Sequence, residues 1–230
     1  ECLMVSKRNA LSTWLVVAHS SFELARYPDA EVAYQNVLQL TAADDASRPE
    51  LVENLAASIY KQGELANQAS DFQAAAAHFL RVGEAAPTSR IRPNADYDAA
   101  TALIQLKNWE QAAIVLNAFR KNHPKHELQA DVTKKMAFVY SESGQLLLAA
   151  AEFERIETES KDESVRREAL QTAASLYIKA LAADKALSVY RRYLGFFPRP
   201  LEPALETHNQ IATLLKERRD ESGYLKELRQ

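Results

Sequence analysis

ATALIQLKNWEQAAIVLNAF at residues 100–119 and AFVYSESGQLLLAAAEFERI at residues 137–156 carry one pattern of small and large apolar residues, offset by 37 positions. The matching positions of the first copy are Ala100, Leu103, Trp109, Ala112, Leu116 and Phe119, and those of the second are Ala137, Tyr140, Leu146, Ala149, Phe153 and Ile156. Apolar residues at three- and four-residue intervals predict amphipathic helices. Self-similarity at a period of about 20 to 50 residues is typical of stacked repeats. The stretch from Pro93 to Lys161 therefore predicts the same helical hairpin twice.

The same offset extends the pattern to four copies in register, with looser copies before and after them. A small residue recurs in the first helix of each copy, at Ala18, Gly63, Ala100, Ala137, Ala174 and Ala212. The second helix has a small residue at Ala30, Ala75, Ala112, Ala149 and Ala186, and a large one four positions later at Tyr34, Phe79, Leu116, Phe153 and Tyr190. Small side chains let two helices approach closely, and residues four positions apart share a helix face. We therefore expect the small residues to set the spacing within each hairpin and the large ones to fill the space between hairpins.

On these positions the chain resembles the tetratricopeptide repeat family. The matching residues of the first copy are Trp14, Ala18, Tyr27, Ala30 and Tyr34, and Pro87, Pro124 and Pro198 close later copies. The family period is about 34 residues, and Lys161 replaces the closing proline in the fourth copy. The resemblance implies an all-α fold, a right-handed α-solenoid (superhelix) of antiparallel helix-turn-helix repeats. Residues 1–230 are expected to form a single array, cut from a longer protein, with repeats at about 7–45, 49–88, 93–125, 126–161, 162–199 and 201–230, the last incomplete.

Local signals place several helix ends. Asp71 is a suitable N-cap for a helix that begins at Phe72, and Asn108 followed by Gln111 resembles a capping box. Gly144 is expected to end a first helix. The polar segment 41–47 predicts the longest interruption of the array.

The composition argues against several classes of protein. The 28 basic and 31 acidic residues leave a net charge of −3, and the arginine pairs Arg166–Arg167, Arg191–Arg192 and Arg218–Arg219 each lie near Asp or Glu. No basic stripe recurs with the repeat, so we expect no nucleic-acid partner. No apolar run approaches the roughly 18 residues of a membrane span, so we expect no membrane insertion. The single cysteine excludes an internal disulfide framework.

Motifs that carry chemistry are lacking. His123 and His126 could share a metal only with further donors, and an ordinary solvated turn explains them better. The acidic pairs Glu152 with Glu154 and Glu157 with Glu159 are two residues apart on helices, so they point away from each other and indicate solvated faces. No phosphate loop or nucleophile motif occurs. We predict no catalytic, cofactor or metal site.

A protein-binding groove is the remaining site. In a solenoid of this kind the first helices line the concave side, and positions beside the small column face the ligand. The candidates are Tyr60, Asn67, Tyr97, Thr101, Ile104, Gln105, Lys134, Phe138, Ser141, Glu142, Gln171, Ser175, Ile178 and Lys179. Tyr and Phe are common anchors for peptides, although Phe138 and Ile104 are equally suited to packing against the next unit. Some family members clamp a terminal carboxylate, but Phe138 stands where that clamp would need an amide, so binding without it is the better hypothesis.

The sequence thus predicts a non-catalytic scaffold that holds a peptide or protein in its concave groove. Two alternatives stay open: a self-assembling structural module, and a regulatory or substrate-recruiting arm of a catalytic domain outside this chain. The long period and the Ala-rich columns resemble repeat proteins of the bacterial cell envelope, which favours the periplasm or envelope over the cytoplasm.

Overall fold

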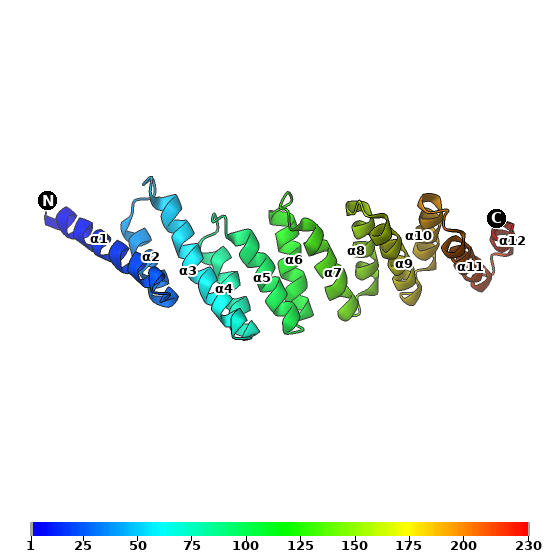
Figure 1. Cartoon of the computed structure of the whole chain (residues 1–230), viewed down its shortest axis with the longest axis horizontal. Helices are drawn as coiled ribbons and strands as arrows, with labels where there is room; N and C mark the ends of the chain where they lie inside the picture. Colours follow the sequence, from blue (N-terminus) through cyan, green and yellow to red (C-terminus); the bar gives the residue numbers. More distant parts are fainter. Residues whose placement is uncertain (1, 230) are drawn as a thin grey trace. The chain divides into compact units, whose positions relative to one another are not determined.

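A computed structural model describes residues 2–229, with side chains from residue 9 onward (Figure 1). Across these residues the secondary structure is helical, with no strand. The helices are α1 (Cys2–Glu23), α2 (Tyr27–Leu40), α3 (Arg48–Gln68), α4 (Phe72–Ala85), α5 (Arg92–Gln105), α6 (Trp109–Asn122), α7 (Gln129–Glu142), α8 (Leu146–Glu159), α9 (Glu163–Lys179), α10 (Ala183–Phe196), α11 (Leu201–Glu217) and α12 (Glu221–Glu227). The odd-numbered members are the first helices of the predicted hairpins, and the even-numbered members are the second helices.

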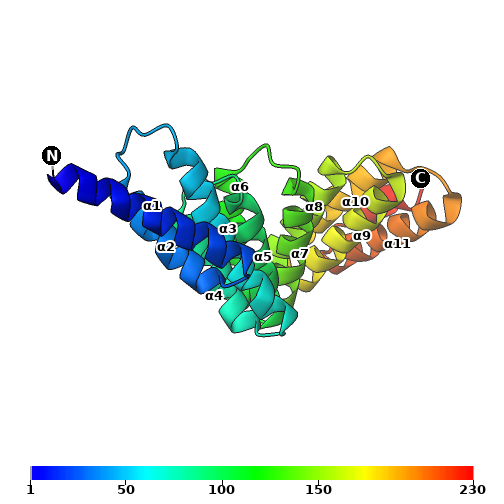
Figure 2. The same cartoon turned by 60° about the vertical axis from the view of Figure 1, so that its left-hand side comes forward.

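The chain divides into two compact units. Unit 1 (Glu1–His126) contains α1 to α6, and unit 2 (Glu127–Gln230) contains α7 to α12. Within each unit every helix packs against the next one along the chain, and short turns make such neighbours antiparallel (Figure 2). The predicted all-α class of antiparallel helix pairs is confirmed, whereas the single continuous array stays a prediction.

Side-chain caps and prolines start several helices. Asp71 accepts a hydrogen bond from the Ala74 amide (3.0 Å), and Asn108 accepts one from the Gln111 amide (3.3 Å). Both predicted N-caps are therefore confirmed. Proline occupies the first turn of α2, α3 and α5, where its missing N–H is no loss.

The first helices end in a recurrent turn. Its key residue has a positive φ, between 55° and 72°, at Ala25, Ser70, Lys107, Gly144, Leu181 and Arg219. The next amide in each turn donates to a carbonyl five residues back, as from Gln145 to Tyr140 (2.8 Å), which is the Schellman arrangement. Gly144 ends α7 as predicted. The other five turns place an L side chain in a conformation that favours glycine.

The predicted columns form the core. The small residues of both columns are buried, and so are the large residues Tyr34, Phe79, Leu116 and Tyr190. Phe153 differs from its counterparts because it is only half-buried, packed against Ala137, Ile156 and Ala169. The sequence pattern therefore locates the interior correctly, and it leaves the other sides of the first helices available to solvent.

Candidate functional site

The predicted groove residues all lie on first helices, and every one is exposed or half-buried. In unit 1, Tyr60 and Asn67 lie on α3, and Tyr97, Thr101, Ile104 and Gln105 lie on α5. In unit 2, Lys134, Phe138, Ser141 and Glu142 lie on α7, and Gln171, Ser175, Ile178 and Lys179 lie on α9. We call these two sets the first-helix face of unit 1 and of unit 2. Their role in binding stays a prediction.

A polar hollow brings three of the unit 1 residues together. It is lined by Tyr60, Glu64, Asn67, Gln68, Phe79, Asp98 and Thr101, from α3, α4 and α5. The Tyr60 hydroxyl donates a hydrogen bond to Asp98 Oδ2, which joins α3 to α5. Burial, together with that carboxylate, raises the pKa of Tyr60. The sequence does not predict Asp98 as a groove residue, because it lies one position after Tyr97 and outside the repeat positions expected to face a ligand. Only the fold places Asp98 opposite Tyr60.

Two hydroxyl groups on the first-helix faces donate hydrogen bonds to carbonyl groups of their own helices. Thr101 Oγ1 donates to the Tyr97 carbonyl (3.0 Å), and Ser141 Oγ donates to the Ala137 carbonyl (2.8 Å). Each can still accept a hydrogen bond from a ligand. Gln171 instead donates to the Tyr193 hydroxyl (3.3 Å), so it helps to hold α9 against α10.

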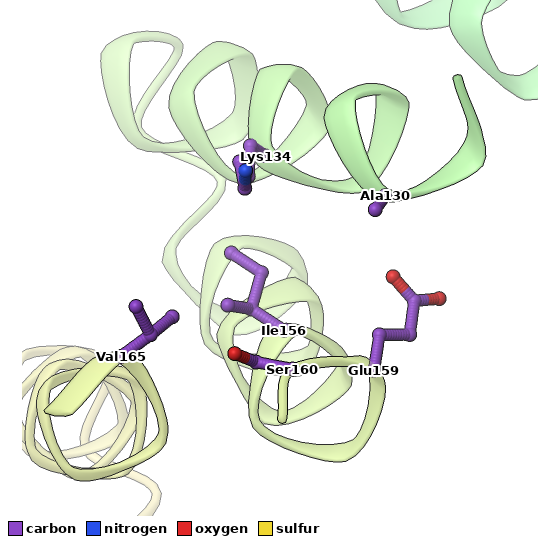
Figure 3. A pocket seen from close by; sticks show the side chains of 6 residues that line it. All are labelled: Ala130, Lys134, Ile156, Glu159, Ser160 and Val165. Atoms are coloured by element: carbon purple, nitrogen blue, oxygen red, sulfur yellow. The ribbon is translucent and has the colours of Figure 1, made fainter. Parts of the chain in front are cut away.

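An apolar hollow lies in unit 2, and we call it the Ile156 hollow (Figure 3). Its lining consists of Ala130 and Lys134 from α7, Ile156 and Glu159 from the end of α8, Ser160, and Val165 from the first turn of α9. Lys134 is the one member that the sequence predicted. The others were missed because they lie at helix ends and in a connector, where the repeat pattern carries little information.

The carboxylates of α8 correct one expectation. Glu152 and Glu157 are buried, so the solvated-face interpretation is wrong for them. Glu157 accepts hydrogen bonds from Arg166 Nη2 (2.6 Å) and Nε (3.1 Å). Glu154 accepts from the Tyr177 hydroxyl (2.6 Å) and pairs with Arg192 Nη2 (2.8 Å). Burial and the nearby Glu154 raise the pKa of Tyr177. These acidic side chains link α8 to α9 and α10 and stabilise the packing of the three helices.

The histidine turn corrects a second expectation. His123 Nε2 lies 3.3 Å from Asp96 Oδ2, and its ring packs edge-on against Phe119, as does that of His126. The turn is therefore anchored on the core and is not simply solvated. Burial raises the pKa of Asp96, and this outweighs the opposite effects of His123 and Arg92. Among the described residues no three His, Cys, Asp or Glu side chains are grouped closely enough to hold a metal ion.

One part of the chain matches a known protein family. Residues 94–126, most of α5 and all of α6, match the tetratricopeptide repeat family. No curated protein sequence matches the chain. Buried small residues, antiparallel pairs and recurrent turns define a helical repeat protein. The match to the tetratricopeptide repeat family covers the third predicted copy of the repeat.

Several solved structures are similar to the chain. MamA (residues 41 to the end) from Desulfovibrio magneticus RS-1 has 13% identity, a TM-score of 0.42, and coverage of 81% of this chain and 94% of its own. PilF from Pseudomonas aeruginosa has 13% identity, a TM-score of 0.42, and coverage of 89% and 99%. A thermophilic tetratricopeptide repeat protein from Thermus thermophilus has 19% identity, a TM-score of 0.37, and coverage of 91% and 98%.

The lengths and hydropathies of the described helices bear on whether this part of the chain contains a membrane span. From residue 2 to residue 229, none is both long enough and apolar enough to cross a bilayer.

Proposed function

We propose that the chain is a non-catalytic scaffold that binds a peptide or a protein on its first-helix face. The observation that carries the proposal is the polar hollow of unit 1. The repeat positions predict Tyr60, Asn67 and Thr101 as groove residues, and all three line this one hollow. Positions that converge in space offer a ligand several contacts at once, which isolated surface residues do not.

The chemistry of this face suits recognition of a polypeptide. Asn67 and Gln105 carry amides that can donate to and accept from a peptide backbone. Tyr60 and Phe79 lie with ring centroids 5.1 Å apart and give the hollow an aromatic wall. Aromatic side chains contribute much contact area for little lost entropy, so they often dominate protein interfaces.

A non-catalytic role of the polar hollow agrees with the state of Tyr60, whose hydroxyl donates a hydrogen bond to Asp98. A general acid or base works best when its pKa is near the working pH. The pKa of Tyr60 is instead raised by burial and by Asp98, away from neutrality. Proteins of this family are also typically non-catalytic, which favours binding over chemistry.

Site-specific photocross-linking tests the proposal. A benzoylphenylalanine probe would be placed at the exposed first-helix positions Gln105 and Ser175, and at the exposed second-helix positions Ala77 and Ser188 as matched controls. The proposal predicts that lysate proteins cross-link to the first-helix probes and not to the controls. Cross-links confined to the controls, or equal at all four positions, would contradict it.

Self-association is a second candidate, favoured by one observation on unit 2. Phe196, Leu201 and Leu205 are 51%, 68% and 52% exposed at the end of α10 and on α11. Exposed large apolar side chains often mark an interaction surface. Light scattering over a concentration series tests this candidate: it predicts a mass increase that Leu201→Ser with Leu205→Ser abolishes, and a constant monomer mass would exclude it.

A further inference from the structure

The Ile156 hollow has an apolar interior of limited size. Ala130, Ile156 and Val165 supply its apolar lining, and its volume is about 160 Å³. An apolar cavity of about 150 Å³ in another protein holds a benzene molecule. The space therefore suits one branched aliphatic side chain, and it is too small for a folded segment.

The equivalent space is closed in the second copy of the repeat. The residues 74 positions earlier, at twice the repeat offset, include Ala56, Val82 and Ala86, and all three are fully buried. In unit 2, Ala130 is exposed and Ser160 is half-buried. These positions are therefore open in the fourth copy and closed in the second.

Two sequence differences account for the open space. Tyr60 of the second copy, which packs on Phe79, corresponds to Lys134. The connector 86–91, which carries Pro87, corresponds to a shorter connector at 160–162 with Lys161 in place of the proline.

The start of α9 adds to the difference between the copies. The Asp162 side chain caps α9 by accepting from the Ser164 amide (2.8 Å) and the Val165 amide (3.3 Å). The early helix start places Val165 in the first turn of α9, whereas its counterpart Ile91 is the N-cap of α5. The Asp162 cap therefore fixes the position of Val165 in the lining of the hollow, and α5, the counterpart of α9, has no such side-chain cap.

The rim of the hollow carries one cation and one anion, on different sides (Figure 3). Lys134 pairs with Asp131 at 3.2 Å, and these side chains are 61% and 51% exposed. Glu159 holds Arg155 at 3.0 Å and is itself only 33% exposed. An exposed ion pair contributes little to stability, so Lys134 can exchange Asp131 for a carboxylate of a ligand at little cost. Charge complementarity therefore selects an acidic group on the α7 side of the hollow.

The geometry points to the Ile156 hollow as the anchoring site for one aliphatic side chain of a bound protein segment, with an adjacent acidic residue of that segment paired to Lys134. This inference rests on the proposed function, because it names the partner chemistry for one part of the first-helix face. The occupant is an extended segment that contains Leu, Ile or Val next to Asp or Glu.

Methyl NMR with defined peptides tests the inference. The probe is N-acetyl-Gly-Leu-Asp-Gly-amide, compared with one peptide that has Ser for Leu and another that has Asn for Asp. The inference predicts saturable shifts of the Ile156 and Val165 methyl signals with the first peptide, no saturable shift with the Ser peptide, and affinity about threefold weaker with the Asn peptide, as expected for an exposed charge pair. No saturable shift of these signals with the first peptide would overturn it.

Three variants sharpen this test. Ala130→Leu fills the hollow and should abolish the shifts, whereas Ala151→Leu makes the same change at an exposed position of α8 and should leave them intact. Lys134→Gln should bind the Asp and Asn peptides equally. Circular dichroism checks that each variant is folded. Binding by Ala130→Leu as tight as by the wild type, or a retained preference for Asp in Lys134→Gln, contradicts the inference. If partners still cross-link at Gln105 and Ser175 while the peptides fail, this inference falls and the proposed function stands.

Discussion

Gly63 lies directly against the ring of Phe79. A Cβ atom at position 63 would come within 2.6 Å of two ring carbons of Phe79, closer than real Cβ contacts. The other copies have alanine at this position, and in the third copy Ala100 corresponds to Gly63 and Leu116 to Phe79. The glycine of the second copy is therefore explained by how closely the Phe79 ring approaches it.

Gly63→Ala should destabilise unit 1 despite the better helix propensity of alanine. Overpacking a core costs about 1 to 3 kcal/mol, against a gain of about 1 kcal/mol for alanine in a helix, so we expect a net loss of about 1 kcal/mol in urea unfolding. Adding Phe79→Leu, which reproduces the third copy, should relieve the clash and give a favourable coupling of about 1 kcal/mol between the two sites. A Gly63→Ala variant that is more stable than the wild type would contradict this account.

Gly144 and Gly195 should respond in opposite ways to alanine. Neither has an atom within 4 Å of an added Cβ, but Gly144 has a φ of +72° whereas Gly195 lies within the helix α10. Gly144→Ala should cost about 1 kcal/mol because an L side chain is strained there. Gly195→Ala should stabilise by about 0.5 to 1 kcal/mol through helix propensity. Thermal unfolding of the two variants gives the sign of each change, and equal signs would refute the explanation from backbone conformation.

Leu181, in the turn that follows α9, allows the reverse substitution, from an L residue with a positive φ to glycine. Leu181 has a φ of 57° and is 93% exposed, so its side chain gains little from packing. Leu181→Gly should therefore remove strain and stabilise the chain by about 0.5 to 1 kcal/mol. Leu176→Gly, at a buried position of the same helix, is the control and should destabilise strongly. Destabilisation by Leu181→Gly would contradict the explanation from backbone strain.

Glu157 should matter far more than a surface carboxylate. Its side chain is 6% exposed and pairs with Arg166 at 2.6 Å, whereas Glu163 is 66% exposed and pairs with Arg167 at 2.5 Å. Removing one partner of a buried pair costs about 3 kcal/mol, so Glu157→Gln should lower the free energy of unfolding by about that amount. Glu163→Gln should change it by less than about 0.5 kcal/mol. Equal effects in denaturant titrations would mean that burial does not set the strength of these pairs.

Glu53 should make part of the stability depend on pH. Burial opposes its ionisation, but hydrogen bonds from the Arg90 amide (2.9 Å) and the Ser89 hydroxyl (2.7 Å), and the charge of Arg90, lower its pKa. A carboxyl whose pKa is lowered by folding stabilises the native state above its unfolded pKa, and this stability is lost as the pH falls through the folded pKa. Glu53→Gln should therefore cost about 1 kcal/mol at pH 7, and the difference from the wild type should shrink as the pH falls through the lowered pKa of the folded protein. Glu50→Gln, at an exposed position of the same helix, should show no such difference.

The repeat and its core can be predicted from the sequence because their signals are local and periodic. Ala100 and Ala137 mark equivalent positions whatever their neighbours are, and helix geometry then fixes which side is buried. Gly144 likewise predicts a turn, because glycine readily adopts a positive φ. Leu181 occupies the same kind of turn after α9, but its residue type does not predict one.

The candidate sites depend on contacts that periodicity does not encode. The burial of Glu157 requires Arg166 from the next helix, and the anchoring of His123 requires Asp96 from an earlier one. The Ile156 hollow depends on the path of a connector and on the Asp162 cap, both of which depart from the repeat. The repeat pattern predicted the residues of the first-helix face, whose role in binding stays a prediction. It missed most of the Ile156 hollow because that hollow lies where the copies differ.

The most direct test of the first-helix face is the affinity of a partner identified by cross-linking. Tyr97→Ala with Phe138→Ala would be compared with Val32→Ala with Ile114→Ala, which truncates two exposed apolar residues on second helices. Truncation of two anchoring aromatic residues should weaken binding by about tenfold or more, and the control pair should bind like the wild type. Unchanged affinity for the Tyr97 and Phe138 variant, with affinity lost in the control pair, would contradict the account and move the binding surface to the second helices.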